Sequence, residues 1–136
     1  MEAIAVIAEF NPFHTGHAYL LSEIRRQSPA DTAVIVIMSG AFVQRGEPAL
    51  FDKWHRACWA VRSGADAVFE LPAVYALSSA AGFASGGVRL ACRLGCTTLA
   101  CGVEAGTAAD FLRLGKTASS LSYDESTKTA TAGRNQ

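Results

Sequence analysis

The sequence has no long apolar run and no excess of charge of either sign. In 136 residues, 12 Lys and Arg residues balance 12 Asp and Glu residues, which gives a formal net charge of zero. A chain without net positive charge has no general electrostatic attraction to nucleic acid or to an anionic membrane. No apolar run approaches the roughly 20 residues that span a bilayer, and the chain does not open with a basic segment of the kind that begins a signal peptide. We therefore expect a cytoplasmic protein without membrane contact.

Recognisable zinc patterns are absent as well. The sequence contains four cysteines, at Cys58, Cys92, Cys96 and Cys101, and no two of them form a Cys-x-x-Cys pair. Structural zinc sites are normally built from such pairs. Free cysteine behaves as a small apolar side chain, so we expect four reduced thiols packed in apolar segments and no metal ion held by the protein.

What is present is an alternation of strand and helix patterns in a chain of one-domain size. Short apolar runs typical of buried strands occupy residues 3–8, 32–38, 67–71 and 97–101. Helical patterns follow them, from Gly16 or His17 onward, over residues 53–63, after Ser79 as far as Leu94, and over about residues 108–116. This order predicts an α/β fold with a Rossmann-like parallel sheet and helices on both faces. Residues 1–116 should form that domain, and the Ser- and Thr-rich residues 117–136 should form a disordered tail.

Three helical segments carry more detailed predictions. Asp52 is expected to cap the helix over residues 53–63. The buried face of that helix is expected to consist of Trp54, Ala57, Cys58 and Val61. In the next helix, Gly86 and Gly87 lower helix propensity but permit close packing on the sheet. Thr107 and Asp110 have the spacing of a capping box for the last helix.

The connection between the first strand and the first helix contains the sequence His14-Thr15-Gly16-His17. A helix begins with unpaired backbone N–H groups and a partial positive charge, so an anion is favoured there, and two imidazoles add donors. A phosphate group suits this site. Two alternatives stay open: one histidine could cap the helix while the other packs in the core, or the two could hold a metal ion at i, i+3 spacing.

Further polar and glycine residues follow the other strands. Ligands of open parallel sheets bind beyond the carboxyl ends of the strands, where Gly40, Arg45, Glu70 and Gly102 should lie with the two histidines. Arg45 stands in an unusually long connection and could hold a phosphate through its planar guanidinium; it could equally pair with Glu47 in a solvated turn. Glu70 in a buried strand should either face the site or pair with an arginine.

Three segments together resemble a known family: AEFNPFHTGHAYLL, VIMSGAFVQRGEPALFDKWHRA and GADAVFELP. They are similar to the N-terminal catalytic domain of the bacterial tRNA(Met) cytidine acetate ligases, within the superfamily of H-x-G-H nucleotidylyltransferases. The resemblance covers about residues 1–114. It implies that acetate attacks the α phosphate of ATP, that pyrophosphate leaves, and that the acetyladenylate acylates the N4 amine of the wobble cytidine in elongator tRNA(Met).

The resemblance also implies residue roles. His14, His17 and Arg45 would be catalytic, with Mg²⁺ plausible as a bridge between the phosphates. ATP would contact Ile7, Ala8, Glu9, Phe10, Asn11, Pro12, Phe13, His14, Thr15, Gly16, His17, Leu20, Gly40 and Gly102. This chain has Val103 where the family usually has a serine after the glycine.

Members of this family are longer, and their tRNA-binding region lies downstream. We therefore expect ATP and acetate as direct partners and tRNA(Met) to bind through a region that this chain lacks. Two other functions remain in view: a nucleotidyltransferase that acts on a small-molecule acceptor, and an ATP-binding module without turnover. No feature of the sequence indicates an oligomeric state.

Overall fold

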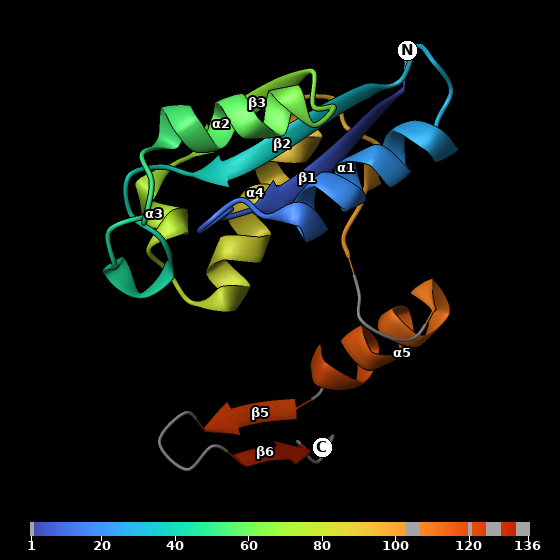
Figure 1. Cartoon of the computed structure of the whole chain (residues 1–136). Helices are drawn as coiled ribbons and strands as arrows, with labels where there is room; N and C mark the ends of the chain where they lie inside the picture. Colours follow the sequence, from blue (N-terminus) through green and yellow to red (C-terminus); the bar gives the residue numbers. More distant parts are fainter. Residues whose placement is uncertain (1, 103–106, 120, 125–128, 133–136) are drawn as a thin grey trace. The chain divides into compact units, whose positions relative to one another are not determined.

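The chain forms two compact units, Met1–Gly102 and Val103–Gln136 (Figure 1). The computed structural model describes residues 2–102, 107–119, 121–124 and 129–132. No helix in these ranges is long and apolar enough to cross a membrane. The first unit contains the parallel sheet and the histidine pair.

Four parallel strands form the sheet of the first unit, in the order β3-β2-β1-β4. They span Ala3–Ala8 (β1), Ala33–Ser39 (β2), Ala67–Leu71 (β3) and Thr98–Leu99 (β4). The parallel sheet and three of its strands are confirmed. The fourth strand was expected over residues 97–101 but has only two residues, because its pairing with β1 ends at the hydrogen bond from Ala100 N–H to Ala5 O (2.9 Å).

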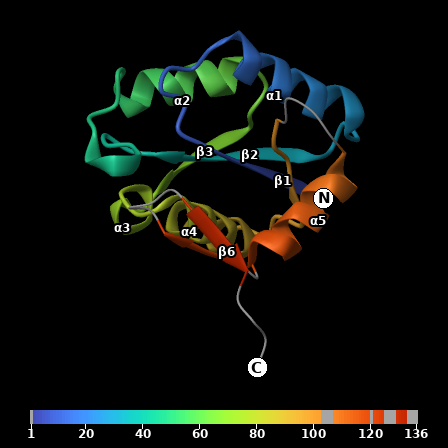
Figure 2. The ribbon, with the colours of Figure 1, turned by 90° about the horizontal axis from the view of Figure 1, so that it is seen from below.

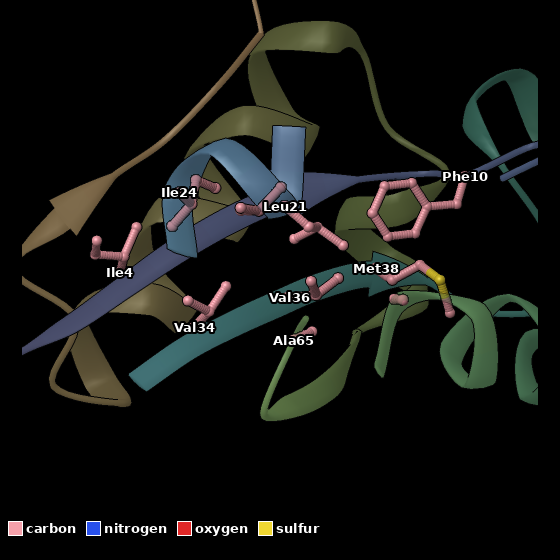
Figure 3. Packing of buried hydrophobic residues seen from close by; sticks show 10 residues of the cluster. Ile4, Phe10, Leu21, Ile24, Val34, Val36, Met38 and Ala65 are labelled. Atoms are coloured by element: carbon pink, nitrogen blue, oxygen red, sulfur yellow. The ribbon is translucent and has the colours of Figure 1, made fainter. Parts of the chain in front are cut away.

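Helices cover both faces of the sheet, as predicted (Figure 2). One face carries α1 (Thr15–Gln27) and α2 (Lys53–Arg62), and the other carries α3 (Ala73–Ala76) and α4 (Ala80–Arg93). On the first face, Leu21 and Ile24 of α1 pack with Val34 and Val36 of β2 and with Ile4 of β1 (Figure 3). A smaller cluster on the other face contains Ala5, Ile37, Leu71, Ala76 and Ala91. Each face thus has its own apolar core.

Gly86 and Gly87 bring α4 close to its neighbours. A Cβ atom on Gly87 would lie 2.7 Å from side-chain atoms of Ile7 in β1, and one on Gly86 would lie 2.2 Å from the ring of Tyr75. Both distances are shorter than any real Cβ contact. The predicted close packing of this helix on the sheet is therefore confirmed, and it depends on the missing side chains.

Of the predicted buried face of α2, only Ala57 packs against the core; the prediction is wrong for Trp54, Cys58 and Val61, which are exposed. Trp54 is 74% exposed and Val61 49% exposed, whereas Arg56 and Ala60 have no exposed surface. A periodicity analysis places an arginine toward solvent, but here its guanidinium has backbone carbonyls to bind inside the protein. The cap is as predicted: the Asp52 carboxylate accepts from the N–H groups of residues 54 and 55, both at 2.9 Å.

The cysteines are only partly where we expected them. All four are free thiols, but three are exposed, namely Cys58, Cys92 and Cys101. Cys96 is half-buried against the smaller core cluster, and burial raises the pKa of its thiol.

The second unit contains α5 (Ala108–Ser119), β5 (Leu121–Asp124) and β6 (Thr129–Ala132), with β5 and β6 paired antiparallel. The predicted capping box is present, because Asp110 Oδ2 accepts from Thr107 N–H at 2.9 Å and Asp110 N–H donates to Thr107 Oγ1 at 3.3 Å. The tail thus has more regular structure than the sequence analysis expected, since β-branched Thr129 and Thr131 favour strands. The division of the chain at residue 116 stays a prediction.

Candidate functional site

The connection between β1 and α1 lies at the carboxyl edge of the sheet. Because all four strands are parallel, they end at this edge, and α1, α2 and α4 begin there (Figure 1). The connection runs from Glu9 to His14 and contains the cis peptide bond between Asn11 and Pro12. β1 ends at Ala8, where the predicted apolar run ends, and the helix starts at Thr15, one residue before the predicted start.

The two histidines form the cap of α1. His14 Nδ1 accepts from the N–H of Gly16 at 3.1 Å, and His17 Nδ1 accepts from the N–H of His14 at 3.2 Å. This is a capping box in which two imidazoles take the places usually held by a hydroxyl and a carboxylate. The rings stack with centroids 3.7 Å apart. The alternative in which a histidine caps the helix is thus part of the structure, and it involves both residues.

The cap fixes which nitrogen of each ring carries the proton. A nitrogen that accepts a hydrogen bond from a backbone N–H must present its lone pair, so each neutral ring has its proton on Nε2. Among the described residues, neither Nε2 atom has a hydrogen-bond partner. Both rings therefore hold an N–H donor that an anion at the start of α1 can use.

Aromatic side chains surround the second histidine. Phe10, which is buried, and Phe13 lie with their ring centroids 4.8 Å and 5.6 Å from that of His17. Burial in this apolar setting lowers the pKa of His17, and the neighbouring His14 lowers it further. His17 is therefore a neutral donor at neutral pH, while His14 is exposed to solvent.

Gly16 has no side chain because the His14 ring occupies that space. A Cβ atom on Gly16 would lie 2.9 Å from His14 Cε1 and 3.1 Å from its Nδ1. The glycine thus permits the first histidine to lie over the start of the helix.

The long connection after β2 is fastened to the β1–α1 connection by two side chains. Glu9 Oε1 accepts from the N–H of Gln44, and Asn11 Oδ1 accepts from the N–H of Leu50, both at 2.7 Å. Gln44 opens the short 3₁₀ turn η1 (Gln44–Gly46). The segment over residues 44–50 is consequently held against the residues that lead into the histidine motif.

Arg45 projects from this turn. Its backbone is in the left-handed region at φ 68°, which is uncommon for a residue with a side chain, and the side chain is exposed. The pair with Glu47 considered as an alternative is not found among the described residues. The guanidinium of Arg45 is therefore available to an anion.

Gly40 and Glu70 meet at the ends of β2 and β3. A Cβ atom on Gly40 would lie 2.0 Å from Glu70 Oε1, so the carboxylate occupies the space above the glycine. Lys53 Nζ, at the start of α2, lies 2.5 Å from Glu70 Oε2. The sequence analysis expected an arginine partner or a position facing the site; the partner is a lysine instead.

Arg56 is the residue that the sequence analysis missed. Its guanidinium donates to the carbonyls of Phe51 (2.9 Å), Glu9 (2.6 Å) and Ser39 (3.1 Å), and also to that of Gly40. These carbonyls belong to the ends of β1 and β2 and to the residues just before α2. The sequence gives only a weak signal for this role, because an arginine in an amphipathic helix normally lies on the exposed face.

The remaining predicted site residues are spread over this edge. Ile7 and Leu20 pack against the two core clusters, so a ligand would meet their backbone more easily than their side chains. Gly102 follows β4 and is exposed, and no atom of the described residues lies within 4 Å of the place where its Cβ would be. No group of three or more His, Cys, Asp and Glu side chains able to hold a metal ion occurs among the described residues.

A helix that starts with two imidazole donors, at the carboxyl edge of a parallel sheet, is the arrangement predicted from the sequence for a protein of the nucleotidylyltransferase type. The family model described as HIGH Nucleotidyl Transferase matches residues 1–135. The chain belongs to this family.

Relatives within the family agree with the resemblance predicted from the sequence. The tRNA(Met) cytidine acetate ligase of Pediococcus pentosaceus is 60% identical over 104 residues, which cover 76% of this chain and 28% of the relative. The enzyme of the same name from Lysinibacillus sphaericus is 46% identical over 112 residues, covering 82% of this chain and 28% of the relative. The chain thus spans little more than a quarter of the length of these relatives.

Solved structures are similar as well. Thermotoga maritima TmcAL bound with alpha-thio ATP superposes with a TM-score of 0.77 at 42% sequence identity, over 85% of this chain and 28% of that protein. The apo form of the same protein gives a TM-score of 0.76 over 85% and 27%. The fold predicted from the sequence is confirmed by these structures.

Proposed function

We propose that this chain binds ATP at the start of α1 and transfers its adenylyl group to acetate, as the first step in N4-acetylation of the wobble cytidine of elongator tRNA(Met). The observation that carries the proposal is the pair of Nε2–H donors that His14 and His17 hold beside the first amides of α1. The relatives named tRNA(Met) cytidine acetate ligase and the ATP-analogue complex of the Thermotoga maritima protein support the choice of nucleotide and reaction.

The chemistry follows from this arrangement of donors. A carboxylate oxygen of acetate attacks the α phosphorus of ATP, the bond from that phosphorus to the bridging oxygen breaks, and pyrophosphate leaves with both electrons of the bond. Negative charge builds up on the phosphate oxygens in the transition state, where two fixed N–H donors stabilise it. Arg45, which forms no ion pair with the residues that the structure describes, would hold the departing pyrophosphate.

The second half-reaction joins the acetyl group to the tRNA. The N4 amine of the cytidine attacks the acetyl carbonyl, AMP leaves, and the amine loses a proton. In this proposal the tRNA is bound by regions such as those that the longer relatives have beyond the part matched here. ATP, acetate and tRNA(Met) would meet in the cytoplasm, and Mg²⁺ bound to the nucleotide would neutralise part of the charge of its phosphates.

The test is exchange of labelled pyrophosphate into ATP by the purified chain, with and without acetate. Acetate-dependent exchange is the expected result. Exchange that depends on another small acid would favour a different acceptor, and ATP binding without any exchange would leave a binding module.

Two histidine variants locate the activity. We expect His17→Ala to lower the exchange rate by about 10² to 10³, the usual loss when one donor to a transition-state oxyanion is removed. The control is His55→Ala, because His55 is exposed on α2 and lies outside the cap. Full exchange by the His17 variant would remove the histidine pair from the mechanism.

A further inference from the structure

The buried arginine of α2 is unusual in both its burial and its partners. Among the described residues, Arg56 is the only charged side chain without exposed surface. All its hydrogen bonds go to backbone carbonyls, and none goes to a carboxylate. Burying a guanidinium is costly unless its N–H groups are used, so these carbonyls are the reason for an arginine here.

The carbonyls share a position in the fold. Parallel pairing of β1 with β2 ends at Ala8 and Met38, and beyond it the carbonyls of Glu9, Ser39 and Gly40 all face the same guanidinium. The planar fork of an arginine can donate to all of them and to Phe51 at once. The ammonium of a lysine carries three donors on one atom and cannot span the same set.

We propose that Arg56 is a positioning residue for the triphosphate site: it fixes the connection that carries Arg45 relative to the turn that carries the histidines. The proposal rests on the proposed function, because it assigns Arg56 to the same site. Glu9 and Asn11 hold that connection from one side, at Gln44 and Leu50, and Arg56 holds both of its ends, at Gly40 and Phe51. Released from this hold, Arg45 and the imidazoles would no longer keep a fixed separation.

The main experiment compares Arg56→Lys with Arg62→Lys, an exposed arginine of the same helix. We expect Arg56→Lys to lower acetate-dependent exchange by about 10²-fold, the loss that a displacement of about 1 Å produces. Hydrogen exchange should also become faster at the amides of Gln44 and Leu50 but not at that of Val36 in β2. The Arg62 variant should match the wild type in both measurements. A folded Arg56→Lys protein that has a lower melting temperature but exchanges pyrophosphate into ATP at the wild-type rate would overturn the proposal.

A second variant protects the test against loss of folding. Glu9→Ala removes the acceptor for Gln44 N–H without leaving a buried charge unpaired, and it should lower the exchange rate in the same way. An unchanged rate in this variant would overturn the proposal even if Arg56→Lys does not fold. If the wild-type chain itself shows no exchange, the proposed function fails. In that case only hydrogen exchange tests the positioning role. Unaltered hydrogen-exchange rates at the amides of Gln44 and Leu50 in the Arg56→Lys protein would overturn it.

Discussion

Substituting Gly16 by alanine should separate binding from stability. The new Cβ would lie 2.9 Å from His14 Cε1, so the ring must move and its hydrogen bond to the amide of residue 16 must break. Loss of a helix cap costs about 1 kcal/mol, and replacing glycine by alanine inside a helix returns up to about 1 kcal/mol. We therefore expect the free energy of unfolding to change by less than about 1 kcal/mol.

The effect on ATP should be much larger. The displaced ring can no longer place its Nε2–H beside the first amides of α1, and a hydrogen bond to a charged group contributes about 1.5 to 3 kcal/mol. The dissociation constant for an ATP analogue should thus rise by about 10-fold to 150-fold, measured by isothermal titration calorimetry. Thermal unfolding followed by circular dichroism gives the stability.

The matched control is Gly115→Ala in α5, where the added Cβ would meet no atom of the described residues within 4 Å. It should leave ATP binding unchanged. Wild-type affinity in the Gly16 variant would refute the reasoning, because it would mean that the position of the first imidazole does not matter to the ligand. A large loss of stability would also refute it, since the gain in helix propensity from glycine to alanine would then not offset the loss of the helix cap.

Three further predictions follow from packing and protonation. Gly87→Val should lower the free energy of unfolding by about 1 to 3 kcal/mol, because its side chain would overlap β1, whereas Ser85→Ala on the same helix should not; equal melting curves would contradict this. The imidazole of His17 should titrate below 6.5 in an NMR experiment, because burial lowers its pKa in the folded state. The stability that the neutral ring contributes should therefore be complete above pH 6.5. It should be lost as the pH falls through the folded-state pKa. Trp54→Ser should cost less than about 0.5 kcal/mol in a denaturant titration, while Leu21→Ala should cost about 2 to 5; similar losses would mean that the exposed face of α2 is covered in solution.

Much of the fold could be predicted because its signals are local. The strands Ala3–Ala8, Ala33–Ser39 and Ala67–Leu71 are short apolar runs bounded by turn residues, and such runs are buried on both faces of a parallel sheet. The cap by Asp52 and the capping box of Thr107 and Asp110 were also predicted, since each depends on residues within one turn of helix.

The errors concern interactions between residues far apart in the sequence. Arg56 reaches carbonyls 16, 17 and 47 positions away, and no periodicity contains that information. Similarly, nothing in the sequence near Glu70 showed that its partner would be Lys53, which is 17 positions away. The histidines were found as candidates from their spacing, but the ring nitrogen that each uses for the helix is a property of the folded turn. The roles of the candidate site residues toward ATP stay predictions.

The histidine cap restricts which amino acids can stand at residues 14 and 17. Each ring must offer a lone pair toward the backbone on one side and a proton toward the ligand on the other. An asparagine amide can imitate the inner nitrogen, and a glutamine amide can imitate the outer one, but neither reaches both places. Substitution by asparagine should therefore preserve the helix start and abolish phosphate recognition. Both the cap of the helix and the proposed binding of phosphate thus depend on imidazole rings at these two positions.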